Sequence, residues 1–154
     1  MRKLKTATTP PNVFRKPMVE QEQEQSMSTS EMMGAFIFEL MNGRTKTHLA
    51  HLSVSGPGGY AAHMALNGFY DGVEDFIDSL AEQYQGVTEK LLVYPESAEI
   101  PTMKTADEGV EYLRKLYSMC EEIQEYCGYS EIINTIDEIK SLINSTKYKL
   151  IFLK

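Results

Sequence analysis

The chain has 154 residues, of which 42% are hydrophobic, and a net charge of −7. This length supports one hydrophobic core and therefore a single globular domain. No apolar run approaches the roughly 18 residues that a membrane span needs, and no apolar segment of a signal peptide follows the basic N-terminus. We therefore expect a soluble, cytoplasmic protein that does not bind a membrane.

Residues 1–27 are predicted to form a flexible or extended arm that precedes a domain at 28–154. The arm contains several prolines and the run Glu-Gln-Glu-Gln-Glu-Gln, and it has few large apolar residues. Residues 1–30 have a net charge of +2, which leaves −9 on the rest of the chain. The arm either binds nucleic-acid phosphates or a partner protein, or is simply a solvated tail. Its basic residues are Arg2, Lys3, Lys5, Arg15 and Lys16.

Helical periodicity begins directly after the arm. Ser28 and Glu31 have the spacing of a capping box, and the apolar pattern that follows predicts a helix to about Leu52. The turn at 53–59, SVSGPGG, is short enough to make the second helix an antiparallel neighbour. The second helix is predicted from about Tyr60 to Gln85, with Gly86 as its stop.

Two further amphipathic segments follow a link of roughly 20 residues. The third helix is predicted over 110–127 and the fourth after Ser130, while residues 148–153 are either a frayed helix end or a short extended tail. Cys120 and Cys127 lie on one predicted helix about 10 Å apart, too far for a disulfide. Four helices with one long connection indicate an all-α four-helix bundle with a crossover between the second and third helices.

The second helix also has a polar stripe, centred about 150° from its apolar stripe. This stripe is either an ordinary solvated face or a set of ligands that a second subunit completes. Imidazole together with carboxylates suits Fe or Mn, whereas the absence of a thiolate pair argues against a structural zinc site. His48 and His51 on the first helix are candidates for a further nitrogen ligand, although a lone histidine such as His48 is more often a surface or packing residue than a ligand. The stripe consists of His63, Asn67, Asp71, Glu74, Asp78 and Glu82.

The residues from His51 to Gln83 resemble the signature of the Dps family, the ferritin-like mini-cage proteins of starved bacterial cells. The resemblance rests on His51 followed by the turn at Gly56, on His63 twelve residues after His51, and on Asp78 and Glu82 with Ala81 between them. It implies a ferritin-like bundle in which His51 of one subunit joins Asp78 and Glu82 of its neighbour to bind iron, with His63 close by. The resemblance extends to ferritin-like chains encoded by tailed bacteriophages, so it also implies that the arm docks in a virion.

The sequence departs from the Dps pattern at several positions. Asn67 stands where the family usually has an aspartate, which removes an anionic oxygen from the second iron position. Leu52 replaces the usual aromatic residue after the first histidine, and the link between the second and third helices is short and contains two prolines. Tyr60, Tyr70 and Tyr84 are interpreted as packing or boundary residues rather than radical carriers.

The leading hypothesis is a Dps-like ferroxidase. It would oxidise Fe(II), preferably with peroxide, at an intersubunit site of His51, His63, Asp78 and Glu82, with Asn67 at the weaker position. Iron would bind as one or two ions, with Mn or Zn as substitutes, in a homo-oligomer ranging from a dimer to a 12-subunit cage, and DNA would be protected from oxidative damage. The alternative is a ferritin-like structural or interaction protein with a degenerate metal site, which binds virion components or nucleic acid. Purification with bound iron would argue against that alternative.

Overall fold

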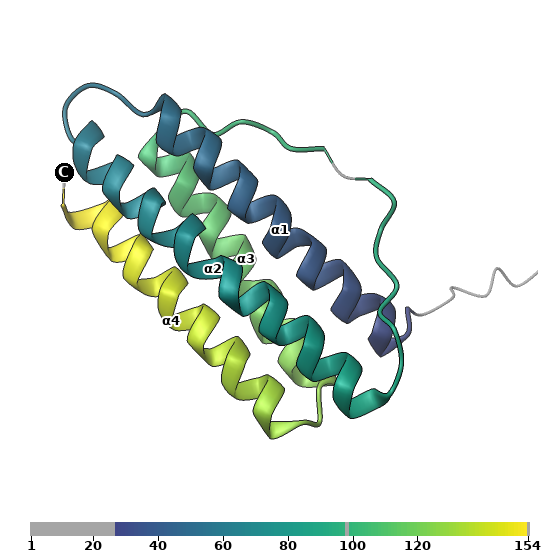
Figure 1. Cartoon of the computed structure of the whole chain (residues 1–154). Coiled ribbons are helices and arrows are strands. Elements are labelled where there is room, and N and C mark those ends of the chain that lie inside the picture. The colour runs from purple at the N-terminus through teal and green to yellow at the C-terminus, as the bar shows by residue number, and fades with distance from the viewer. Residues whose placement is uncertain (1–26, 98, 154) are drawn as a thin grey trace, which may run out of the picture.

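The computed structural model describes residues 27–97 and 99–153 as four helices packed side by side (Figure 1). The arm assigned to 1–27, including all five of its basic residues, lies outside the described residues except for Met27. The described residues form helices and loops with no strand, so the prediction of an all-α four-helix bundle is confirmed. The helices are α1 (Thr29–Ser53), α2 (Gly59–Thr88), α3 (Ala106–Tyr126) and α4 (Ser130–Phe152).

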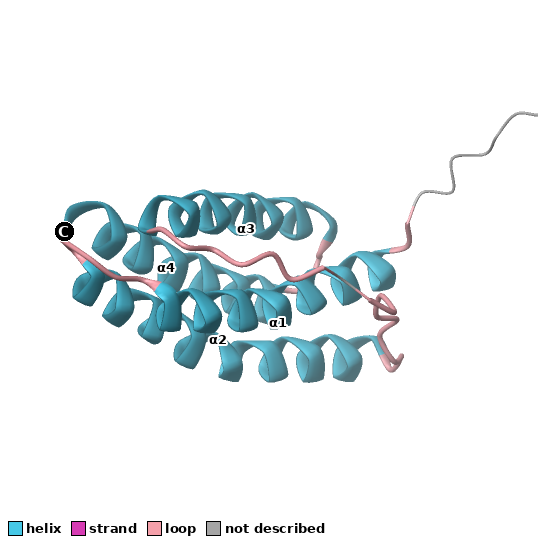
Figure 2. Cartoon of the chain, turned by 90° about the horizontal axis from the view of Figure 1, so that it is seen from above, coloured by secondary structure: helices cyan, strands magenta, loops and turns pink. Residues whose placement is uncertain are grey.

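The connections determine which helices are neighbours. α1 packs on α2 and α3, and α4 packs on the same two helices, so α2 and α3 lie diagonally across the bundle. The link from Glu89 to Thr105 runs along the outside of α1 for most of its length (Figures 1 and 2). α2 and α3 therefore run in the same direction, which confirms the predicted crossover. The described residues of the link contain no helix.

Local signals at the helix ends are partly confirmed. The backbone N–H of Ser28 donates to Glu31 Oε2 at 2.8 Å, and the N–H of Glu31 donates to Ser28 Oγ at 3.3 Å, so the capping box forms as predicted. The prediction that Gly86 ends the second helix was wrong. α2 continues to Thr88, and Glu89 takes the left-handed conformation that ends it, with φ 54°. The last residues continue α4 as a helix to Phe152.

The core is apolar and continuous along the bundle axis. Each helix contributes residues at spacings of three and four, as the sequence predicted, although Phe76 is only partly buried and Ile77 takes its place in the core. Both cysteines are buried and free. The largest fully buried side chains are Met33, Ile37, Leu40, Leu66, Phe69, Leu80, Leu113, Leu116, Ile132, Ile136, Ile139 and Ile143.

A polar network lies between α1 and α3 beside the core. The buried Lys46 ammonium lies 2.7 Å from Glu39 Oε1, and the Tyr112 hydroxyl donates to the same oxygen at 3.0 Å. Burial, reinforced by the Glu39 carboxylate, raises the pKa of Tyr112. The network is satisfied internally, so it ties α1 to α3 without an unpaired charge.

No helix in the described part of the chain is long and apolar enough to cross a membrane.

Candidate metal centre

The turn between α1 and α2 brings two histidines into direct contact. His51, in the last turn of α1, stacks on His63 of α2 with ring centroids 3.6 Å apart and an interplanar angle of 24°. Their hydrogen bonds are reciprocal: His51 Nδ1 lies 2.9 Å from the carbonyl oxygen of His63, and His63 Nδ1 lies 3.0 Å from that of His51. Residues twelve apart in sequence thus form one closed pair.

The partners of the two rings determine their tautomers. A carbonyl oxygen only accepts a hydrogen bond, so each Nδ1 carries the proton and donates it. In the tautomer with the proton on Nδ1, Nε2 is the unprotonated nitrogen, which is the atom that a metal ion would bind. A metal-ligating histidine in proteins is typically held in this way, with its other ring nitrogen bound to a carbonyl or carboxylate. The backbone carbonyls therefore fix the orientation of both rings.

A third histidine and a tyrosine extend the ring cluster. His48 stacks on Tyr70 with centroids 4.3 Å apart, and Tyr70 meets the edge of His51 at 5.3 Å. The Tyr70 hydroxyl donates to Asn67 Oδ1 at 3.1 Å, and the Asn67 amide donates to Asp71 at 2.5 Å. The oxygen of Asn67, the predicted weak ligand, is thus already engaged by Tyr70.

The acidic candidates lie further along α2. Asp78 and Glu82 are exposed and one helical turn apart, and neither has an ion-pair or hydrogen-bond partner within the described ranges. Between them and the histidines, Glu74 forms an ion pair with Arg44 of α1 at 3.0 Å. Asp78 and Glu82, at the C-terminal end of the polar stripe, are therefore the carboxylates without a protein partner in the described part of the chain.

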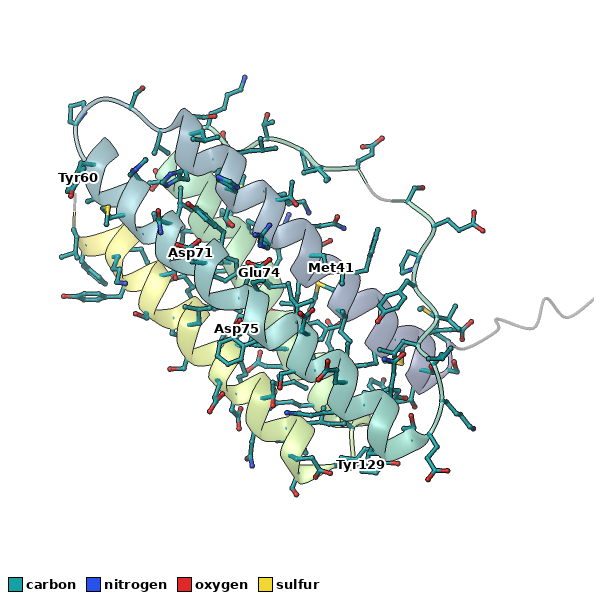
Figure 3. The ribbon with its side chains drawn as sticks, viewed as in Figure 1. Met41, Tyr60, Asp71, Glu74, Asp75 and Tyr129 are labelled. Atoms are coloured by element: carbon teal, nitrogen blue, oxygen red, sulfur yellow. The ribbon has the colours of Figure 1, made fainter. Side chains whose placement is uncertain are left out.

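The four acidic members of the stripe are exposed, as predicted, whereas His63 and Asn67 are only partly exposed. Asp71, Glu74 and Asp75 of α2 lie on the same side of the bundle as Met41 of α1 (Figure 3). Several apolar side chains of α1 and α2 are exposed to solvent. They are Met41, Leu49, Leu52, Tyr60 and Met64.

One chain does not bring the predicted ligands together. Asp78 follows His63 by 15 residues, which is about 22 Å along a helix at 1.5 Å per residue. Accordingly, no group of three or more His, Cys, Asp or Glu side chains within 27–97 and 99–153 is close enough to hold a metal ion. The structure brings His51 and His63 together and leaves Asp78 and Glu82 apart from them.

The sequence pattern did not predict that Tyr70 contacts the histidines. Tyr70 follows His63 by seven residues, which is two helical turns, so its position beside the polar stripe was available from the spacing. Its stacking on His48 required the packing of α1 against α2, which no local pattern contains.

The fold is a four-helix bundle in which the histidines of α1 and α2 form a stacked, hydrogen-bonded pair. One family matches the chain, over residues 51–150, and it is described as a family of unknown function, DUF5856. The chain belongs to this family, and the matched range includes His51, His63, Asp78 and Glu82. No curated protein and no solved structure shows a significant match to it.

Proposed function

We propose that two copies of this chain form an iron-oxidising site, in which His51 and His63 of one copy face Asp78 and Glu82 of the other. Fe(II) is the substrate, peroxide is the preferred oxidant, and the ferric product is sequestered by a ferritin-like assembly. Consumption of peroxide in this reaction limits oxidative damage to DNA. The observation that carries the proposal is the reciprocal hydrogen bonding of His51 and His63, which leaves both Nε2 atoms free.

The nitrogen half of the site supports the proposal through its rigidity. Both rings are held by stacking and by a backbone hydrogen bond, so little side-chain entropy is lost when a metal ion binds. His51 is 7% exposed, so its ring keeps one orientation. A solvated surface histidine would have neither constraint.

The acidic half supplies the charge that the chemistry needs. Carboxylates are hard oxygen ligands that favour Fe(III) over Fe(II), so they promote loss of an electron. Asp78 and Glu82 project from successive turns of one face, which lets both oxygens reach the same ion. Glu74, in contrast, is neutralised by Arg44.

An antiparallel pair of α2 helices joins these halves. If the two helices cross near Asp71, His63 of one copy lies level with residue 79 of the other, within a turn of Asp78 and Glu82. The same symmetry forms two identical sites, one on each side of the axis. Exposed apolar residues of α1 and α2 are available to be covered by such a contact.

A complementation experiment tests both the chemistry and the intersubunit geometry. Fe(II) is added anaerobically to the protein, followed by peroxide, and the ferric absorbance is recorded. His51→Ala and Asp78→Asn should each lose most of the catalysed rate, while Glu125→Gln, an exposed carboxylate on α3, should retain it. Co-expression of the two inactive variants should restore activity, because a mixed dimer contains one site with both native residues.

Three results would contradict the proposal. They are a strictly monomeric mass in native mass spectrometry, no ferric product above that of the inactive variants, and no recovery of activity in the mixed dimer. Protein that contains no iron after growth in iron-rich medium would favour the alternative of an interaction protein.

A further inference from the structure

The outward side of α2 carries negative charge that the described part of the chain leaves largely uncompensated. α2 contains five acidic residues and neither lysine nor arginine. All five are exposed, and Asp71, Glu74 and Asp75 lie along one side of the helix (Figure 3). Within 27–97 and 99–153, the ion pair of Glu74 with Arg44 is the only one that these acids form. Four carboxylates remain without a cation, and we call them the acidic face: Asp71, Asp75, Asp78 and Glu82.

The other three helices carry cations of their own. α1 and α4 each contain as many lysines and arginines as acids, and α3 has Arg114 and Lys115 among its acids. On α2, by contrast, Asp71 and Asp75 are one helical turn apart, as are Asp78 and Glu82. Like charges at this spacing repel each other and destabilise a helix. Cations supplied from outside the helix would relieve this repulsion.

The beginning of the chain has the opposite charge. Residues 1–16, which we call the basic segment, contain Arg2, Lys3, Lys5, Arg15 and Lys16 and no acidic residue. The glutamates of residues 17–26 lie between the basic segment and α1 in the sequence. The same chain therefore contains a segment with only positive charges and a helix with only negative ones.

The acidic face lies within reach of the basic segment. α1 and α2 are joined by a short turn and pack side by side, so the first turn of α1 lies at the same end of the bundle as the last turn of α2 (Figures 1 and 2). Lys16 precedes Ser28, the N-cap of α1, by 12 residues. A random-coil chain of that length spans about 20 Å, and an extended one about 40 Å. The acidic face extends about 16 Å along α2, from Glu82 to Asp71.

We propose that the basic segment docks on the acidic face of α2 in its own chain. Covalent attachment gives the segment an effective concentration in the millimolar range at this face, which favours it over a separate cationic partner. Each exposed ion pair is weak and screened by salt, so several pairs together hold the segment. Asp78 and Glu82 are also the acids of the proposed iron site, so the docked segment and a second copy exclude each other there. The docking itself does not depend on iron.

Carbodiimide coupling of the full-length protein without metal tests this contact, because it joins a lysine amine directly to a carboxylate that touches it. Trypsin releases the acids of α2 in the peptide 47–90 and those of the C-terminal half of α3 in the peptide 116–140. Each peptide contains six exposed acidic residues, so the second is a matched control for the first. Coupling of the basic segment to 47–90 should exceed coupling to 116–140 several-fold, and high salt should remove the difference.

Two double variants provide a second readout, the rate at which trypsin cleaves the folded protein after Arg15. Asp78→Asn with Glu82→Gln should release the basic segment and increase this rate several-fold. Glu121→Gln with Glu125→Gln removes the same charge from exposed positions on α3 and should leave the rate unchanged.

Equal coupling to the two peptides, or the same cleavage rate in both double variants, overturns the docking. A mixture of unlabelled and nitrogen-15-labelled protein identifies the chain that supplies the segment. Cross-links within one isotope support docking in the same chain, whereas cross-links between isotopes overturn it in favour of a neighbouring copy. Since no metal is present, these outcomes are independent of the proposed iron oxidation.

Discussion

Replacing Gly34 with alanine should destabilise the bundle, although the same change in an open helix stabilises a protein. Gly34 lies in α1 beneath the link, and a Cβ built on it would overlap the carbonyl oxygen of Val93 and lie 2.9 Å from the carbonyl carbon. Both atoms belong to backbone, which cannot rotate away as a side chain can. The link must therefore move outward.

The magnitude follows from two opposing contributions. Alanine is favoured over glycine in a helix by about 1 kcal/mol. Overpacking against a backbone segment costs about 3 kcal/mol, at the upper end of the usual range, because moving the link also exposes the buried Leu92. The net expectation is a loss of about 2 kcal/mol, which for a chain of this length lowers Tm by roughly 4–8 °C.

Gly86→Ala is the matched control for this prediction. Gly86 is also helical, in α2, but a Cβ there would meet nothing within 4 Å, so the variant should gain about 0.5–1 kcal/mol. Urea unfolding followed by circular dichroism measures both free energies. Equal stabilisation by the two substitutions would refute the close packing of the link on α1.

Three further predictions concern stability. Ser28→Ala removes the capping box of α1 and should cost about 1 kcal/mol in urea unfolding, whereas Ser130→Ala, which caps no helix, should cost less than half as much. Lys46→Ala leaves the Glu39 carboxylate without its cation and should cost about 3 kcal/mol; a loss below about 0.5 kcal/mol would contradict the network. Burial raises the pKa of Cys120 from 9.0 to about 12, so its contribution to stability is fully present below pH 9.0 and is lost as pH rises towards about 12. The stability of Cys120→Ala, measured by unfolding at a series of pH values, should therefore fall less steeply across that range.

Much of the fold could be predicted from local sequence patterns. The capping box at Ser28, the apolar stripe of α2 and the break at 53–59 each depend on residues a few positions apart, and all three are present in the structure. The end of α2 was mispredicted because Gly86 is not in a left-handed conformation, whereas Glu89 is. Glycine permits a helix end but does not require one.

The candidate site could be predicted from the sequence only in part. The spacing of His63, Asp78 and Glu82 placed them on one outward face, since helical periodicity alone fixes that relation. The pairing of His51 with His63 depends on the packing of α1 against α2 and on backbone carbonyls that no residue type identifies. The contact of Tyr70 with His48 depends on the same packing.

By itself, the sequence determined the helices, their apolar faces and the outward polar stripe, because each follows from interactions within a few turns of one helix. Only the tertiary structure decided which ring nitrogens face a backbone carbonyl, that Tyr70 contacts the histidines, and that Asn67 accepts a hydrogen bond from Tyr70. Those features arise from contacts between residues on different helices and from the hydrogen bonds that these contacts permit. They depend on how the helices pack together, which a periodic pattern does not specify.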